Sequence, residues 1–345
     1  MLQLIFPQLV KGAPKDALLR REIVTCSHLG FTLLSGLKIN MKHLITIVGP
    51  TAIGKTSLSL ILANQLKCEI ISCDSRQFFK EMTIGTAVPT STELAAAPHH
   101  FIQNKSIFEN YTVGDFEKEA ITKIEELFLT TDYVILVGGS GLYVNAVLKG
   151  FDDFPEIDSS VREAVNAQYE KLGIVYLQEQ LKKLDFVYFE KITKENPQTL
   201  QNPQRMMRFI EVAIGSGQPY SSFLNQKKNE RSFTPIIIGL EAERSMLYNR
   251  INQRVDMMMQ EGLLAEAKAL FANKELNALQ TVGYRELFSS LDGDFSLEFA
   301  VEEIKKNTRR FAKRQLTWFK RDENTKWFNF ETPYDTIISY INSIK

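Results

Sequence analysis

The sequence predicts an α/β fold in which a parallel sheet carries helices on its faces, joined to a mostly helical insertion and a helical C-terminal region. Apolar strand-like runs at 44–48, 68–73 and 133–137 alternate with helix-like runs at 55–66 and 115–128. Such alternation is typical of a parallel sheet, because parallel strands need crossover connections that are usually helices. We therefore expect ligands at the carboxyl ends of the strands.

The first strand runs directly into a glycine-rich loop of the form G-x-x-x-x-G-K-T. Glycines at this spacing let backbone N–H groups surround an anion, and the following helix directs its positive end to the same place. The lysine adds a positive charge, and the threonine hydroxyl can bind a phosphate oxygen or Mg²⁺. The core is therefore expected to be P-loop NTPase-like, with a polyphosphate bound by Gly49, Pro50, Thr51, Ala52, Ile53, Gly54, Lys55 and Thr56.

The order of these runs divides the chain into parts. Residues 41–150 and 235–345 are expected to form the P-loop core, which includes a buried strand at 235–240, and residues 151–234 to form a mostly helical insertion. Residues 1–40 mix apolar and basic side chains without clear periodicity. We expect them to be a poorly ordered N-terminal extension, or to precede a true start at Met41. A targeting peptide is the alternative.

Composition limits the possible classes of protein. Because the formal net charge is zero, any nucleic-acid binding must come from a local patch. No apolar stretch approaches the ~20 residues that span a bilayer, so we expect no membrane association. Cys26, Cys68 and Cys73 lack metal-binding spacing, which suits a reducing cytoplasm. A monomer is the default expectation.

Two loops at the expected ligand edge carry further candidates. Asp74 follows the second strand, where a carboxylate can bind Mg²⁺ or act as a general base beside the phosphate site; a helix cap is the alternative. The third strand ends in the segment 138–141, Gly-Gly-Ser-Gly, where P-loop NTPases usually place a metal-binding acidic residue. The glycines indicate a close approach of the backbone to a ligand; a plain tight turn is the alternative.

Arginines follow the strand at 235–240. Arg250 and Arg254 are one helical turn apart and could bind a leaving diphosphate. The pattern alone favours a solvated helix face that also includes Arg244, with carboxylate partners at Glu241, Glu243 and Asp256.

A basic run lies near the C-terminus. Residues 305–321 contain eight basic and no acidic side chains, interleaved with aromatic residues. Such a run is typical either of a solvated helix face or of a surface that follows a phosphate backbone. A second, smaller basic patch lies at 202–208.

In combination, these segments resemble the tRNA dimethylallyltransferases (tRNA isopentenyltransferases) over about residues 41–321. No Cys/His cluster follows residue 100, so the chain looks like the shorter bacterial type. Together and in this order, the segments are specific to that family. They are GPTAIGKT (49–56), DSRQ (74–77), IGTAVP (84–89), PHH (98–100), YTVGDF (111–116), GGSGLY (138–143), NPQR (202–205), VGYR (282–285) and AKRQLTWF (312–319).

The resemblance implies a reaction and its catalytic residues. A dimethylallyl group would pass from dimethylallyl diphosphate to the exocyclic amine of the adenosine 3′-adjacent to the anticodon, with the base flipped into a pocket. Asp74 would be the general base and Arg254 would steady the diphosphate, which the P-loop binds with Thr56 and the cofactor Mg²⁺. Whether ATP also binds is left open.

The resemblance also implies a surface for the tRNA anticodon stem-loop. Arg76 departs from a commoner apolar residue, Phe79 from a frequent tyrosine and Ser140 from a common threonine. The implied contacts are Asp74, Ser75, Arg76, Gln77, Ser140, Arg162, Gln204, Arg205, Met206, Met207, Arg208, Gln280, Thr281, Val282, Gly283, Tyr284, Arg285, Lys313, Arg314, Gln315, Leu316, Thr317, Trp318, Phe319 and Lys320.

Two other functions fit part of the pattern. A small-molecule P-loop kinase would bind ATP and would need an acidic partner for Mg²⁺, but it would have no use for the basic run. A non-catalytic nucleic-acid-binding module would bind tRNA with a steep salt dependence and would release no diphosphate.

Overall fold

The computed structural model describes residues 41–225 and 230–344. The expectations for residues 1–40 concern residues outside these ranges. Within them, no helix is both long and apolar enough to cross a membrane.

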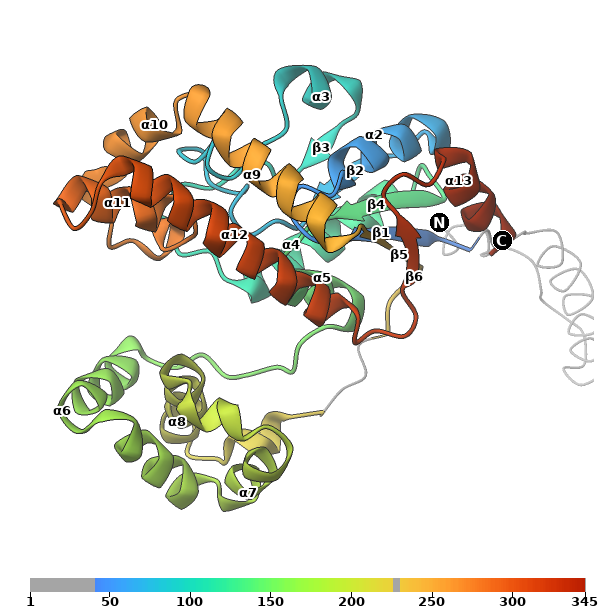
Figure 1. Ribbon diagram of the computed structural model, residues 1–345. Coiled ribbons are helices and arrows are strands. Elements are labelled where there is room, and N and C mark those ends of the chain that lie inside the picture. The colour runs from blue at the N-terminus through green and yellow to red at the C-terminus, as the bar shows by residue number, and fades with distance from the viewer. Residues whose placement is uncertain (1–40, 226–229, 345) are drawn as a thin grey trace, which may run out of the picture. The chain divides into compact units, whose positions relative to one another are not determined.

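A six-stranded sheet forms in the described residues, in the order β3-β2-β4-β1-β5-β6, with every pairing parallel (Figure 1). All residues of the central strand β1 are buried, and its Ile45 lies between Ile135 and Ile236. Continuous apolar runs of this kind are typical of parallel strands covered on both faces. The strands are β1 (His43–Val48), β2 (Ile70–Ser72), β3 (His99–His100), β4 (Tyr133–Val137), β5 (Thr234–Glu241) and β6 (Lys326–Asn329).

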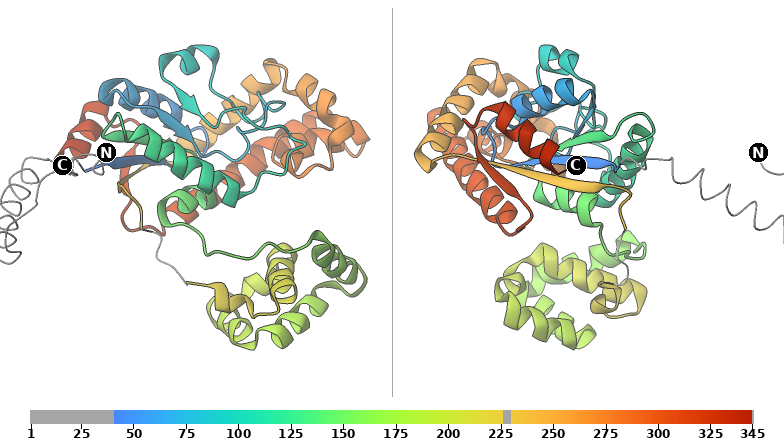
Figure 2. Two further views of the ribbon diagram at one scale, coloured as in Figure 1. Left: turned by 180° about the vertical axis from the view of Figure 1, so that it is seen from behind. Right: turned by 90° about the vertical axis from the view of Figure 1, so that its right-hand side faces the viewer.

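Helices cover both faces of this sheet (Figure 2). Helices α2, α9 and α13 share one hydrophobic core with Ile47 and Ile238. Helices α4 and α5 share another with Leu44 and Val48, the alternate residues of the same strand. The helices outside the insertion are α2 (Lys55–Leu66), α3 (Ser91–Ala96), α4 (Val113–Leu127), α5 (Gly141–Lys149), α9 (Arg244–Gln260), α10 (Leu263–Leu270), α11 (Tyr284–Asp292), α12 (Leu297–Phe319) and α13 (Tyr334–Ser343).

The segment between β4 and β5 is mostly helical and has a hydrophobic core of its own. Leu177 and Leu181 pack there with Met206 and Ile210. The long helix is interrupted at Gly173, whose φ of +70° lies outside the helical range. The helices are α6 (Ser159–Leu184), α7 (Phe186–Glu195) and α8 (Pro203–Ser216), with short 3₁₀ turns at Pro197–Gln201 and Tyr220–Phe223.

The predicted α/β fold with a parallel sheet is confirmed, and the differences are local. The strand predicted at 68–73 is shorter, because Cys68 is still bonded to the end of α2, donating its N–H to the Ala63 carbonyl (3.1 Å). Strands β3 and β6 were not predicted. Both are short edge strands, and the two histidines of β3 carry no apolar pattern.

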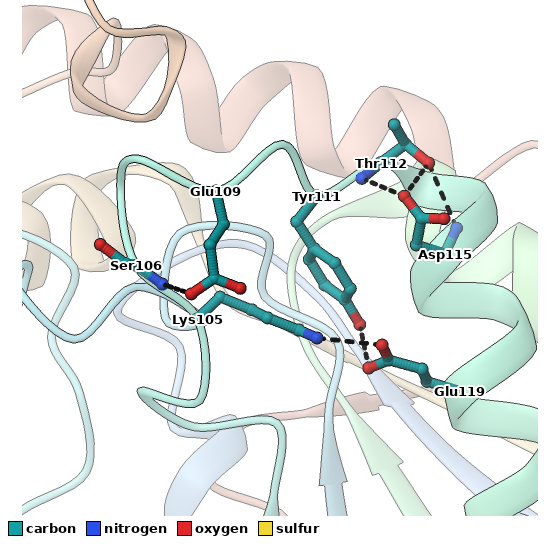
Figure 3. A network of polar contacts seen from close by, with 7 residues as sticks. All are labelled: Lys105, Ser106, Glu109, Tyr111, Thr112, Asp115 and Glu119. Atoms are coloured by element: carbon teal, nitrogen blue, oxygen red, sulfur yellow. Dashed lines mark hydrogen bonds and ion pairs between the residues drawn. The ribbon is translucent and has the colours of Figure 1, made fainter.

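The segment YTVGDF builds the start of α4 (Figure 3). Thr112 and Asp115 form a capping box, in which the Thr112 N–H donates to the Asp115 carboxylate (2.9 Å) and the Asp115 N–H donates to the Thr112 hydroxyl (3.2 Å). The Tyr111 hydroxyl and the Lys105 ammonium both bind Glu119 at 2.9 Å. The capping box of Thr112 and Asp115 stabilises the helix by ~1 kcal/mol. The helix therefore begins at Val113, earlier than predicted.

Candidate active site

The P-loop lies between the end of β1 and the start of α2, as its sequence predicts. Its backbone requires glycine at Gly49, where φ is +146° and an added Cβ would lie 2.7 Å from the Leu240 carbonyl oxygen. Gly54, at φ +110°, is the residue directly before α2. The loop therefore places the N-terminus of α2, with its unpaired N–H groups, where an anion can bind.

Three side chains hold consecutive residues of this loop. The Lys55 ammonium donates to the Pro50 carbonyl (2.8 Å) and the Arg250 Nε donates to the Ala52 carbonyl (2.8 Å). Between them, the Thr51 N–H donates to Oε1 of Gln315 in α12 (2.9 Å). Ala52 itself has a φ of +63°, which is unusual for a residue with a side chain. The first half of the loop is thus fixed by the lysine of its own motif and by α9 and α12.

Lys55 and Asp74 influence each other across the site. Burial lowers the pKa of Lys55 to about 8, while the Asp74 carboxylate raises it and Arg254 lowers it. Burial also lowers the pKa of Arg254, again opposed by Asp74. The cluster contains two cations and one carboxylate, so it favours an anionic ligand.

Asp74 is held by a local turn that leaves it in the site. Its Oδ1 accepts the Arg76 N–H (3.1 Å), which resembles the capping alternative considered from the sequence. The same side chain lines two neighbouring cavities. Asp74 can therefore hold this turn and still act on a ligand in the cavities.

The two cavities share a wall formed by the P-loop, α9 and α12. One has a volume of about 460 Å³ and is lined by residues 51–57 together with Arg250, Arg254, Glu93 and His99. The other has a volume of about 430 Å³. Its apolar lining includes Ile251, Val255, Met258, Val282, Ile304 and Trp318. The residues that line both are Thr51, Ala52, Asp74, Thr86, Arg254, Phe311 and Gln315.

Arg250 and Arg254 point to the P-loop side of α9 rather than to solvent, so the solvated face favoured by the pattern is wrong for them. Two of the three carboxylates expected to pair with them have other partners: Glu241 binds Lys320 (2.8 Å) and Asp256 binds Lys305 (2.8 Å). Arg244 does lie on the surface, where it bonds the Tyr248 hydroxyl (3.0 Å).

The glycines after β4 permit close packing of protein against protein. A Cβ on Gly138 would lie 2.5 Å from the Cys73 sulfur, one on Gly139 would overlap the Gln315 amide, and one on Gly141 would overlap the Trp318 indole. Gly138, Gly139 and Gly141 also line the two cavities, so the expected close approach to a ligand stays a prediction. The nearest atoms belong to the β2 loop and to α12, which these glycines allow to reach the site.

This chain matches the family model described as IPP transferase over residues 77–322. The chain belongs to the IPP transferase family. A curated relative from Flavobacterium johnsoniae, named tRNA dimethylallyltransferase, is 75% identical over 87% of this chain and 97% of its own length.

Solved structures agree with this membership. The full-length tRNA isopentenylpyrophosphate transferase of Bacillus halodurans is 37% identical, with a TM-score of 0.63 over 88% of this chain and 95% of its own. A eukaryotic dimethylallyltransferase described as acting on tRNA is 25% identical, with a TM-score of 0.64 over 84% of this chain and 74% of its own.

In this IPP transferase, the DSRQ segment is largely occupied with internal contacts. The Ser75 N–H donates to the Ser140 hydroxyl (3.1 Å), which joins the β2 and β4 loops. Arg76 donates to the carbonyls of Asn277 and Ala278 (both 2.9 Å). Gln77 donates to the Ala87 carbonyl (2.9 Å). These side chains position the segments 84–89 and 277–282 around the cavities.

The residues implied to contact tRNA divide into exposed and buried sets. The exposed members outside the insertion are Lys313, Arg314 and Thr317 in α12, Lys320 directly after it, Gln280, and Arg285 in α11. In the insertion, Gln204 and Arg205 are exposed, while Arg162 and Arg208 form ion pairs with Glu211 (3.2 and 2.8 Å). Leu316, Trp318, Thr281 and Val282 are partly buried.

Six residues of the implied set are buried: Met206, Met207, Gly283, Tyr284, Gln315 and Phe319. The side chains of Met206, Met207, Tyr284 and Phe319 lie in hydrophobic cores, where they support the surface. Gly283 and Gln315 line the cavities, so their implied contact with tRNA stays a prediction.

Sequence reasoning gave no role to Glu93 and His99, which line the cavity at the P-loop, or to Glu266, which accepts the N–H groups of residues 83–85. Glu93 and Glu266 lie in helices with no local pattern that marks a site, and His99 stands in the PHH segment, which supported the resemblance without a role for this side chain. For Mg²⁺, no cluster of three His, Cys, Asp or Glu side chains occurs in the described parts of the chain. Thr56 and Asp74 line the same cavity and suit an ion that keeps waters and phosphate oxygens as ligands.

Proposed function

We propose that this chain transfers a dimethylallyl group from dimethylallyl diphosphate to tRNA, at the exocyclic amine of the adenosine 3′-adjacent to the anticodon. The names of its relatives support dimethylallyl transfer to tRNA. The observation that carries the proposal is that Asp74 and the P-loop line one cavity that opens onto an apolar neighbour.

The diphosphate would occupy the cavity at the P-loop. Lys55, Arg254 and the N–H groups at the start of α2 would bind its oxygens, and Thr56 would hold Mg²⁺. Mg²⁺ would help neutralise the leaving diphosphate. Charge that grows on the leaving group is thereby stabilised by groups already in place.

The dimethylallyl chain and the flipped adenine would meet at the shared wall. The allylic C–O bond breaks, its electrons leave with the diphosphate, and the amine nitrogen forms the new C–N bond. Asp74 then takes the proton that the amine loses. General-base catalysis of this kind contributes typically ~10²–10⁴-fold, and the apolar lining from α9 and α12 excludes water that would otherwise attack the allylic carbon.

The anticodon stem-loop would dock on the exposed basic residues of α12 and of α8. Lys313, Arg314 and Arg205 are exposed and carry the charge that a phosphate backbone requires. Asp74, Ser75, Arg76, Gln77 and Ser140 would frame the opening through which the base enters. A cytoplasmic monomer fits this role.

The test is incubation of the recombinant chain with unmodified tRNA, Mg²⁺ and isotope-labelled dimethylallyl diphosphate, followed by nucleoside mass analysis. The proposal predicts one labelled N6-substituted adenosine per tRNA. A chain that instead hydrolyses or transfers phosphate from ATP would support the kinase alternative. Binding of tRNA with no labelled nucleoside would support the non-catalytic module.

A further inference from the structure

Gln315 is the one residue of the basic run 305–321 whose side chain is bonded into the P-loop. It is 6% exposed and lies in α12 between Arg314, which is exposed, and the partly buried Leu316. Its side chain lines both cavities. Gln315, which lines the proposed diphosphate site, therefore directly follows Arg314 of the proposed RNA surface in the sequence.

The amide of Gln315 is saturated by two backbone groups. Its Oε1 accepts the Thr51 N–H (2.9 Å), and its Nε2 donates to the Gly139 carbonyl (3.0 Å). Only one orientation of the amide satisfies both partners, because the first needs an acceptor and the second a donor. Gly139 has no room for a Cβ beside this amide. The contact is therefore specific to an uncharged side chain of this length.

The contact has a consequence for the P-loop. Thr51 is the middle of the three residues that side chains hold, and its N–H is already committed to α12. The orientation of this peptide therefore depends on where α12 lies. Lys313 and Arg314, on the exposed side of the same helix turn, are where RNA phosphates would bind.

We propose that Gln315 is a positioning residue that couples tRNA docking on α12 to diphosphate binding in the P-loop, so that each substrate tightens the other. RNA bound to the exposed face restrains α12, and the Gln315 amide transmits that restraint to Thr51. Because the P-loop is then already ordered, diphosphate loses less conformational entropy when it binds. Linkage requires the effect to be reciprocal. This inference rests on the proposed function.

The test measures binding of an unmodified anticodon stem-loop RNA to the full chain, with and without saturating inorganic pyrophosphate and Mg²⁺. In the unaltered chain, pyrophosphate should tighten RNA binding at least ~5-fold, the lower end of typical allosteric coupling. In Gln315→Met, which keeps the length and removes both hydrogen bonds, the tightening should fall to about 1-fold, whatever the affinity of each ligand alone.

The matched control is Gln260→Met, the same change at an exposed position at the end of α9; it should keep the full tightening. Hydrogen exchange adds a structural readout: RNA should slow exchange of the peptide containing Thr51 in the unaltered chain but not in Gln315→Met. If Gln315→Met does not fold, Gln315→Asn replaces it, since one methylene fewer lets the amide reach only one partner.

Coupling that persists in the folded Gln315 variant would overturn the inference, as would an unaltered chain that transfers dimethylallyl normally but shows no coupling. A chain that neither binds RNA nor transfers dimethylallyl would instead refute the proposed function. The two failures are therefore distinguishable.

Discussion

The hydroxyl of Tyr284 donates a 2.6 Å hydrogen bond to the carboxylate of Glu266. The same carboxylate accepts the N–H groups of three consecutive loop residues, Thr83 (3.0 Å), Ile84 (2.8 Å) and Gly85 (2.9 Å). An added Cβ on Gly85 would lie 2.6 Å from the Tyr284 ring. Gly85 lines the apolar cavity. One carboxylate thus ties α10 and α11 to a wall of the site.

Tyr284→Phe should therefore destabilise the protein and loosen this wall. Tyr284 is fully buried and its hydroxyl bonds an acceptor that is a carboxylate, so removing it should cost about 1–3 kcal/mol in the free energy of unfolding. Urea denaturation measures this. Tyr334→Phe, at an exposed tyrosine, is the control and should change the free energy by less than ~0.5 kcal/mol. Equal effects for both variants would contradict the role given to Glu266.

Diphosphate binding should weaken as the pH rises through about 8. Burial lowers the pKa of Lys55 to about 8, so the free protein loses the Lys55 charge above this pH. The other titratable groups facing it are Asp74, Arg254 and Cys73. Titration calorimetry with inorganic pyrophosphate between pH 6.5 and 9.5 measures the effect.

Lys55→Met supplies the control for that titration, because the protonation of pyrophosphate itself affects both proteins. The difference in affinity between the two should be largest below pH 8 and should shrink above it. A difference that is constant across the range would contradict a titrating Lys55.

The sequence predicted the central fold and many of the residues that line the cavities. It did not predict which of these residues contact one another. Local patterns place the P-loop, Asp74 and the 138–141 loop at one sheet edge, because parallel strands end together. They could not reveal that Gly139 faces Gln315, since those residues are 176 positions apart and meet only through packing. The Arg250–Ala52 contact was missed for the same reason.

The sequence of the basic run 305–321 also did not predict which of its side chains are buried. Phe319 and Lys320 are neighbours in an aromatic and basic segment, yet Phe319 is in the core and Lys320 at the surface. Which face of α12 is buried depends on α5 and on the glycines of the β4 loop. Helical periodicity gives a face but not its neighbours.

Gly139→Ala, in the loop after β4, should impair the protein, although glycine-to-alanine changes stabilise where the backbone and the space allow them. The new Cβ would overlap the Gln315 amide and displace it from the P-loop. Gly114→Ala is the matched control, since its Cβ would meet nothing closer than 3.7 Å and it lies inside α4. We expect Gly114→Ala to be neutral or stabilising by up to ~1 kcal/mol, and Gly139→Ala to lower the melting temperature and the affinity for pyrophosphate. Wild-type behaviour of Gly139→Ala would contradict the packing described.

Lys313 and Lys320 should differ in their contribution to RNA binding. Lys320 pairs with Glu241 (2.8 Å), whereas Lys313 has no ion-pair partner among the residues that the structure describes. Lys313→Gln should therefore lower the slope of log affinity against log salt by about 1, and Lys320→Gln by less. Filter binding of an anticodon stem-loop at several salt concentrations measures both slopes. A larger change for Lys320→Gln would place the RNA elsewhere on α12.

The central claim is that Asp74 takes the amine proton in a cavity shared with the P-loop. The most direct measurement is single-turnover dimethylallyl transfer by Asp74→Asn, with tRNA and pyrophosphate affinities determined on the same protein. Loss of the base should slow transfer by ~10²–10⁴-fold while both affinities stay within ~3-fold, since the amide keeps the turn to Arg76. Transfer at the rate of the unaltered chain would contradict the assignment.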